Sequence, residues 1–195
     1  MSAVRAFQQD LDEIAQLWDE EDYDDALDRV EEARKAWPGN SHLHILWASL
    51  VQLQDNPKHS LDEAEQALRQ AVELNRSSPA AVIDLGYFLD RVKDDPRAAA
   101  ETFAQGVDQA RQLLIDGLIG RAKALLQVDQ VEEAFQHALE VLNLLSCESR
   151  TPDHSQNHDL DALLRTGENI RNGSRPPTAE QIEGFLDAVI VHQSA

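Results

Sequence analysis

Ala26-Leu27-Asp28-Arg29-Val30 is the stretch that decides the fold, because similar short segments return along the chain at nearly constant spacing. The related segments lie at Ala64, Ala99 and Ala134, so the four alanines are separated by 38, 35 and 35 residues. A repeat of this length is typical of stacked helix pairs, in which each pair buries its apolar face on its neighbours. The sequence therefore predicts an all-α fold, and such stacks usually serve to hold another molecule.

The chain is strongly acidic. Its 195 residues include 17 Lys and Arg against 36 Asp and Glu, which gives a formal net charge of −19. Nucleic acid is not expected as a partner, because binding phosphates needs a clustered basic face. An anionic membrane surface is disfavoured for the same reason. We expect a protein or peptide partner of basic or neutral character, with the alternative that the acidity serves only solubility.

The cysteine content and the apolar runs bear on the compartment. Cys147 is the single cysteine, so no disulfide can form within the chain, which fits a reducing compartment. The first ten residues lack the apolar core of a signal peptide. No apolar run approaches the roughly 20 residues that span a bilayer. We therefore expect a cytoplasmic protein.

Hydrophobic periodicity and turn residues divide the chain into three expected parts. Residues 1–146 carry the four helix pairs, and residues 147–158 are polar with one proline, which indicates a linker. Residues 159–195 are expected to form C-terminal helices. The last of these has one apolar face, which we expect to cap the open end of the stack. The residues of that face are Ile182, Phe185, Leu186 and Val189.

Several of these positions resemble the tetratricopeptide repeat (TPR) family, whose unit has 34 residues. Tyr23-Asp24-Asp25-Ala26 resembles the family's turn into its second helix, and Pro38 follows at the family spacing. Leu85-Gly86 resembles the Leu-Gly of the first helix, and Phe103 matches the large residue of the second. The resemblance implies a right-handed superhelical stack of about four helical hairpins with C-terminal capping helices. Sel1-like repeats, which tolerate longer units, are a close relative in pattern.

The first helices of the TPR family line a concave groove, so the resemblance also implies a set of groove residues. These positions are mixed apolar and polar, with little positive charge. The family's clamp for acidic chaperone tails needs several Lys, Arg or Asn in these places, and Lys123 alone qualifies. The implied groove consists of Leu11, Ala15, Trp18, His42, Ile45, Ser49, Gln52, Ile83, Tyr87, Asp90, Asp116, Ile119 and Lys123.

The aromatic residues have a second interpretation. Packing between repeats is the alternative role for Trp18, Ile45 and Tyr87. For Trp18, this core packing is the favoured interpretation. Trp37 and Trp47 lie near the junction of the first two pairs. Aromatic residues are common anchors in binding sites. We expect them instead to fill the space around the proline that ends the first pair.

The densest charge in the chain is the tract Asp19, Glu20, Glu21, Asp22, Asp24 and Asp25. A calcium-binding loop would need a glycine at its centre and a later glutamate, and this tract has no glycine. The tract is therefore either a solvated outer face, the favoured interpretation, or a patch that contacts a partner.

The histidines give weak signals for metal binding. His154 and His158 have the i, i+4 spacing that can hold a metal on a helix, but the segment lacks helix formers and a third ligand. His42 and His44 are two residues apart and face different sides of a helix. We expect no metal and no cofactor.

No catalytic motif is visible: the sequence has no Gly-rich phosphate loop, no Gly-x-Ser-x-Gly and no His-Glu-x-x-His. The expected function is therefore not enzymatic. It is a protein–protein interaction adaptor or scaffold that binds a peptide or helix in a concave groove. Two alternatives remain: an acidic antagonist, of the immunity or anti-activator type, that blocks a basic partner with its charged face, and an accessory subunit of an enzyme complex.

Overall fold

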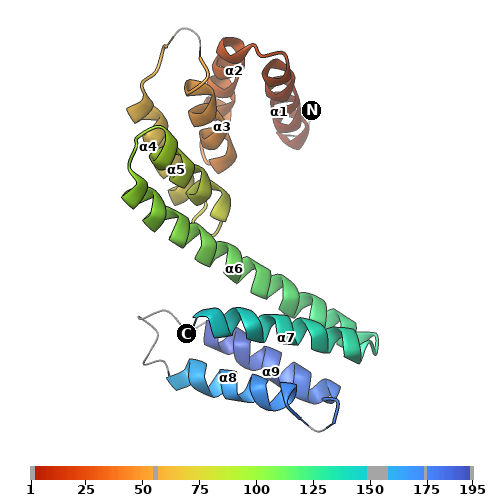
Figure 1. Cartoon of the computed structure of the whole chain (residues 1–195). Helices are drawn as coiled ribbons and strands as arrows, with labels where there is room; N and C mark the ends of the chain where they lie inside the picture. Colours follow the sequence, from red (N-terminus) through yellow and green to blue (C-terminus); the bar gives the residue numbers. More distant parts are fainter. Residues whose placement is uncertain (1–2, 55–56, 149–157, 174, 194–195) are drawn as a thin grey trace. The chain divides into compact units, whose positions relative to one another are not determined.

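A computed structural model describes residues 3–54, 57–148, 158–173 and 175–193. Within these ranges the chain is all helical, and no strand is present, as the sequence predicts (Figure 1). No helix in the described part of the chain has both the length and the apolar character needed to cross a membrane. The helices are α1 (Ala3–Asp19), α2 (Tyr23–Ala36), α3 (Ser41–Val51), α4 (Leu61–Leu74), α5 (Pro79–Arg91), α6 (Pro96–Gln127), α7 (Val131–Glu148), α8 (His158–Arg171) and α9 (Ala179–Gln193).

The four alanines that define the repeat occupy one structural position. Ala26, Ala64, Ala99 and Ala134 are each the fourth residue of their helices, α2, α4, α6 and α7. All four are at most 2% exposed. Each donates its backbone N–H to the carbonyl four residues earlier, the residue just before the helix, at 2.9 to 3.2 Å. The period in the sequence therefore marks a buried position at the start of these four helices.

The turns before three of these helices share a geometry as well. Glu21, Asp94 and Asp129 lie five residues before Ala26, Ala99 and Ala134, and their φ angles are 61°, 51° and 60°. This left-handed backbone lets the chain reverse at the end of a helix. Aspartate adopts it more readily than glutamate does. Ala26, Ala99 and Ala134 thus share both their place in the helix and the turn before it.

The starts of the helices follow from their capping residues. Ser60 and Glu63 form a complete capping box at α4, in which each side chain bonds the other residue's backbone N–H. Thr178 and Gln181 make the same exchange at α9. Asn40 caps α3, because its Oδ1 accepts the backbone N–H groups of residues 42 and 43.

Helix α6 departs from the repeat pattern. Four separate helix pairs would place the second helix of the third pair and the first helix of the fourth pair in different helices, but residues 96–127 form one helix. The stretch Asp108–Leu113 contains no proline, no glycine and no capping sequence, so nothing ends the helix there.

The contacts divide the chain into two compact units, residues 1–110 and 111–195. This division lies inside α6 and differs from the expected repeat domain of residues 1–146. Residues 149–157, most of the expected linker, lie outside the described residues.

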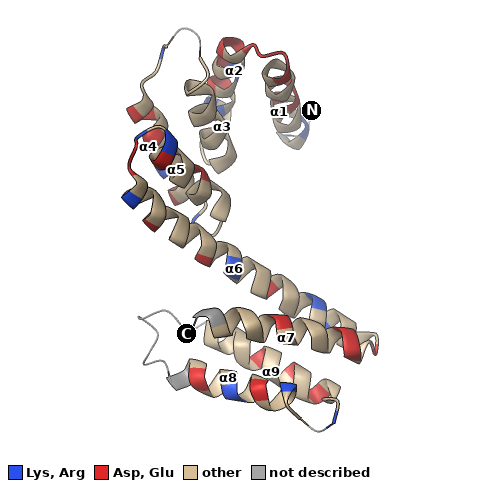
Figure 2. Cartoon of the chain, in the orientation of Figure 1, with Lys and Arg blue, Asp and Glu red and all other residues tan. Residues whose placement is uncertain are grey.

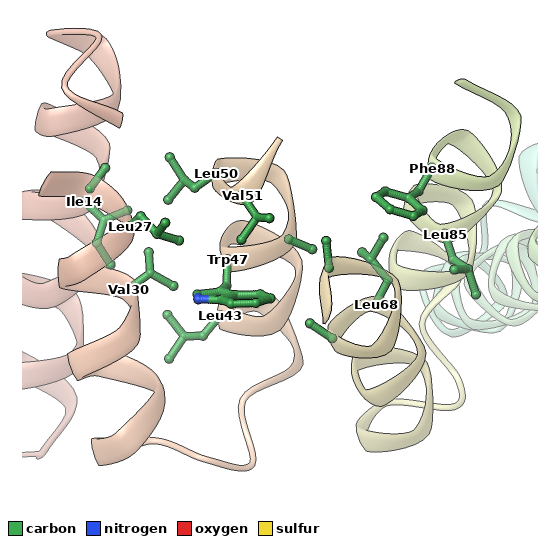
Figure 3. Close-up of a cluster of buried hydrophobic side chains, with 14 of the residues drawn as sticks. Ile14, Leu27, Val30, Leu43, Trp47, Leu50, Val51, Leu68, Leu85 and Phe88 are labelled. Atoms are coloured by element: carbon green, nitrogen blue, oxygen red, sulfur yellow. The ribbon is translucent and has the colours of Figure 1, made fainter. Parts of the chain in front are cut away.

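The core of the first unit is built from the facing sides of α1 to α5 (Figure 3). Leu27 and Val30 of α2 lie on one side of Trp47, and Leu68 of α4 lies on the other (Figure 3). Trp47 is 5% exposed and is therefore a core residue of this unit, as expected for an aromatic near the first junction.

The core of the second unit joins the end of α6 to α7, α8 and α9. Ile182, Phe185, Leu186 and Val189 of α9 are all at most 2% exposed and pack with residues of α7 such as Leu142. The apolar face that the sequence predicts for the last helix is therefore buried within this unit.

Candidate functional site

A pocket of about 400 Å³ lies between α1 and α3. Leu11, Ala15 and Trp18 line it from α1, and His42 and Leu46 line it from α3. Four of these five residues belong to the groove implied by the TPR resemblance, so the structure brings that part of the predicted groove together. We call this the α1–α3 pocket.

The apolar face of α1 builds the wall of this pocket. Leu11, Ile14 and Trp18 recur at helical spacing on that face, and Ile14 at its centre is 2% exposed. Trp18 is half-buried and packs edge-on against Tyr23, with ring centroids 6.1 Å apart. Trp18 therefore contributes both to packing and to the pocket surface.

An ion-pair network holds α1 against α2 on the side away from the pocket. The guanidinium of Arg29 in α2 contacts Asp10 and binds Glu13 of α1 at 2.7 Å. Asp10 also accepts the indole N–H of Trp37 at 3.1 Å. These contacts fix the position of α1 and of the residues that it presents to the pocket.

The acidic tract continues directly from the pocket. Asp19 lines the pocket beside Trp18, and the tract then turns into the start of α2 (Figure 2). Its members are exposed except Asp24, which is half-buried. We call residues 19–25 the acidic turn. An apolar pocket and a cluster of carboxylates are therefore adjacent on one surface.

Asp84 of α5 is a neighbour of the pocket that the sequence analysis missed. Burial raises the pKa of Asp84 above its ordinary value, and the charge of His42 partly offsets this effect. His42 is exposed on α3 and lines the α1–α3 pocket. A half-buried aspartate at the sixth residue of α5 carries no sequence signal that separates it from other surface acids.

The remaining groove residues of the first unit lie outside the α1–α3 pocket. Tyr87 is 47% exposed, packs edge-on against Phe103 at 5.0 Å, and carries the guanidinium of Arg91 over its ring at 4.7 Å. Ile45, Ser49 and Ile83 are half-buried, whereas Gln52 and Asp90 are exposed.

Three predicted groove residues belong to the second unit, and one of them is corrected. Ile119 is 4% exposed in the core of that unit, so it cannot contact a partner from the surface. Lys123 forms an ion pair with Asp187 of α9 at 2.5 Å. Asp116 is exposed and accepts a hydrogen bond from Gln112 at 3.2 Å.

The described residues contain no group of three or more His, Cys, Asp or Glu side chains that could hold a metal ion. His154 lies outside the described residues, and His158 begins α8. His44 is the exception to the apolar core of the first unit, because it is a polar side chain only 4% exposed.

Comparisons with known proteins give one partial relative. No protein-family model matches the chain. An uncharacterized 18.1 kDa protein in the carS 3′ region of Myxococcus xanthus is 32% identical over 81 residues. The match covers 42% of this chain and 48% of that protein, so the chain spans about half the length of the relative that it matches.

Proposed function

We propose that this protein is a non-catalytic adaptor that binds a peptide or helix of a partner protein at the α1–α3 pocket. The observation that carries the proposal is the continuity between this pocket and the acidic turn at Trp18 and Asp19. A pocket of about 400 Å³ is in the size range of ligand sites. It accepts one or two large side chains.

The chemistry of the two features defines the partner. Leu11, Trp18 and Leu46 favour an aliphatic or aromatic anchor, since binding energy concentrates where such a side chain fills a desolvated pocket. The carboxylates of the acidic turn favour Lys or Arg beside that anchor and speed its approach. The expected ligand is therefore an apolar residue flanked by basic residues.

The proposal includes the finer fold and the compartment. The shared position of the four alanines supports a TPR-like arrangement of the hairpins in a right-handed superhelix, in which first helices face the partner. We place the protein in the cytoplasm, since its one cysteine suits a reducing compartment.

A second candidate function follows from the acidic turn alone. Five of its six acidic residues are exposed, and such a surface can block a basic partner as an acidic antagonist does. In that case the partner covers the carboxylates and leaves the pocket empty.

Selection from a random peptide library tests the first candidate. The adaptor function predicts selected peptides that share an apolar anchor next to Lys or Arg and that lose binding to a Trp18→Ala variant. Leu74→Ala serves as the control, because Leu74 of α4 is an exposed apolar residue outside the pocket and outside the implied groove. Peptides with basic residues alone, equally bound by the Trp18→Ala variant, would favour the acidic antagonist.

A further inference from the structure

A second pocket, of about 560 Å³, lies between α2, α3 and α4. Trp47 of α3 lines it, and we call it the Trp47 pocket. It is separate from the α1–α3 pocket, since the two use different faces of α3. His42 and Leu46 line the α1–α3 pocket, whereas His44 and Trp47 line the Trp47 pocket.

The cations of the Trp47 pocket are Arg34 and Lys35, which lie in the last turn of α2. The guanidinium of Arg34 lies 4.6 Å from the centre of the Trp47 ring and 3.0 Å from His44 Nδ1 through Nη2. The carbonyl of Pro38 can only accept, so the His44 Nε2 that contacts it at 3.3 Å carries the proton, and Nδ1 accepts from Arg34. His44 is therefore neutral, in agreement with its pKa, which burial and then the charge of Arg34 lower.

Donors remain on this side after these bonds are counted. The Nε–H of Arg34 is buried and bonds to none of the described residues. Lys35 is exposed and lines the pocket, and its ammonium pairs with no carboxylate in the described part of the chain. Buried donors without acceptors are costly, so this wall suits an anionic group.

The carboxylates of the Trp47 pocket are Glu31, one turn before Arg34 and Lys35 on α2, and Glu63 of α4. Glu31 Oε1 accepts the indole N–H of Trp47 at 3.2 Å and lies 2.6 Å from His59 Nε2. Glu63 Oε1 lies 3.9 Å from His59 Nδ1. Hydrogen bonds from the backbone and side chain of Ser60 lower the pKa of Glu63, so this carboxylate is ionised at neutral pH.

The lining is thus balanced in charge within a chain of net charge −19. Two permanent cations, Arg34 and Lys35, face two carboxylates, Glu31 and Glu63, around one indole. A ligand with only negative charge would be repelled by the rest of the protein, and a simple cation would leave the donors of Arg34 unmatched. A ligand that carries one positive and one negative charge, and is neutral overall, pairs with the cations and the carboxylates of the pocket together.

We propose that the Trp47 pocket binds a small zwitterion with the chemistry of a free amino acid. The carboxylate lies toward Arg34 and Lys35, and the ammonium lies toward Glu31 and Glu63. The side chain of the ligand lies against Pro38, with the amides of Gln66 and Gln70 available as further partners. This inference does not depend on the proposed adaptor function, because it concerns another face of α3.

Titration with each protein amino acid in turn, at millimolar concentration, tests the proposal on the full chain. The indole N–H signals in ¹H–¹⁵N spectra report on the pocket, and the Trp47→Phe variant assigns the Trp47 signal. At least one amino acid is expected to shift this signal saturably while the signals of Trp18 and Trp37 stay in place. Absence of any saturable shift across the set overturns the proposal.

Matched ligands and variants test the two-ended recognition. The methyl ester and the N-acetyl form of the best ligand are each expected to bind at least about tenfold more weakly, the effect of one lost charge-assisted hydrogen bond. Lys35→Glu is expected to weaken binding to a similar degree. Arg97→Glu changes the net charge equally at a residue whose side chain is 92% exposed and outside the pocket, and should leave binding unchanged.

Two further results would overturn the proposal. Equal affinity for the free and N-acetylated ligand means that the ammonium is not recognised, as for a peptide C-terminus. Equal weakening by Lys35→Glu and Arg97→Glu means that overall charge, rather than this pocket, governs binding.

Discussion

Phe103 of α6 packs directly against the backbone of α5 at Gly86, where a β-carbon would lie only 2.7 Å from Phe103 Cε1. Both residues belong to the positions on which the TPR resemblance rests. Their contact explains that pattern physically, since a glycine on one helix makes room for a large ring on the next.

Gly86→Ala is expected to destabilise the protein by about 1–3 kcal/mol, because overpacking outweighs the gain in helix propensity of about 1 kcal/mol. Urea unfolding measures the change. Gly117→Ala is the control, since a β-carbon there meets nothing within 4 Å, and it should stabilise the protein. Adding Phe103→Leu to Gly86→Ala should recover part of the loss; stabilisation by Gly86→Ala alone would contradict the close contact.

Ala99→Asp and Ala134→Asp are each expected to cost about 3 kcal/mol or more, because both place an unpaired charge at a buried helix crossing. Ala100→Asp provides a matched control on the exposed side of the same helix turn. An aspartate in the first turns of a helix is otherwise mildly favourable. Thermal unfolding monitored by circular dichroism compares the melting temperatures of the three variants. Equal melting temperatures for Ala99→Asp and Ala100→Asp would argue against the repeat alignment.

The sequence predicts the helical class, the repeat position of the four alanines and the buried face of α9 because each depends on local spacing. A buried alanine at the fourth position of a helix is visible as a period, and the apolar face of Ile182, Phe185 and Val189 is visible as helical periodicity. Such patterns require no knowledge of distant contacts.

The site is predicted only in part, since it depends on which helices face each other. Leu11, Trp18 and His42 meet in one pocket as the resemblance implies. The fixed repeat register assigns Ile119 to the surface, but the helices of the second unit bury its side chain. The Trp47 pocket is missed because Arg34 and His44 are ten residues apart in sequence and come together only in the fold.

Phe185→Ala is expected to cost about 3–5 kcal/mol, since it removes a large side chain that is 2% exposed in the core of the second unit. Val191→Ala on the same helix is the control. Val191 is 70% exposed, so its truncation should change stability by no more than about 0.5 kcal/mol. The free energy of unfolding in urea measures both, and equal effects would mean that α9 does not pack as described.

Asp84→Asn is expected to stabilise the protein at neutral pH. Burial raises the pKa of Asp84 in the folded state, so the folded protein disfavours the ionised carboxylate. The wild-type protein therefore gains stability as the pH falls through this raised pKa. The advantage of the variant should disappear below the unfolded-state pKa of about 3.9. Urea unfolding from pH 7 to pH 3 measures it, with the exposed Asp90→Asn on the same helix as the control; a pH-independent advantage would contradict this cause.

The adaptor function makes its sharpest prediction about salt. Trp18→Ala removes part of the α1–α3 pocket but leaves the charge of the protein unchanged, so the association rate of a selected peptide should stay the same. The dissociation rate should rise at low and high salt alike. Replacing Asp22, Asp24 and Asp25 with Asn should mainly lower the association rate at low salt. That difference should vanish near 1 M salt, where the Debye length is about 3 Å. Surface plasmon resonance at both salt concentrations separates the two rates, and Leu74→Ala controls for the loss of an exposed apolar side chain outside the pocket. Normal binding by Trp18→Ala, together with complete loss of binding by the acidic variant, would replace the adaptor with the acidic antagonist.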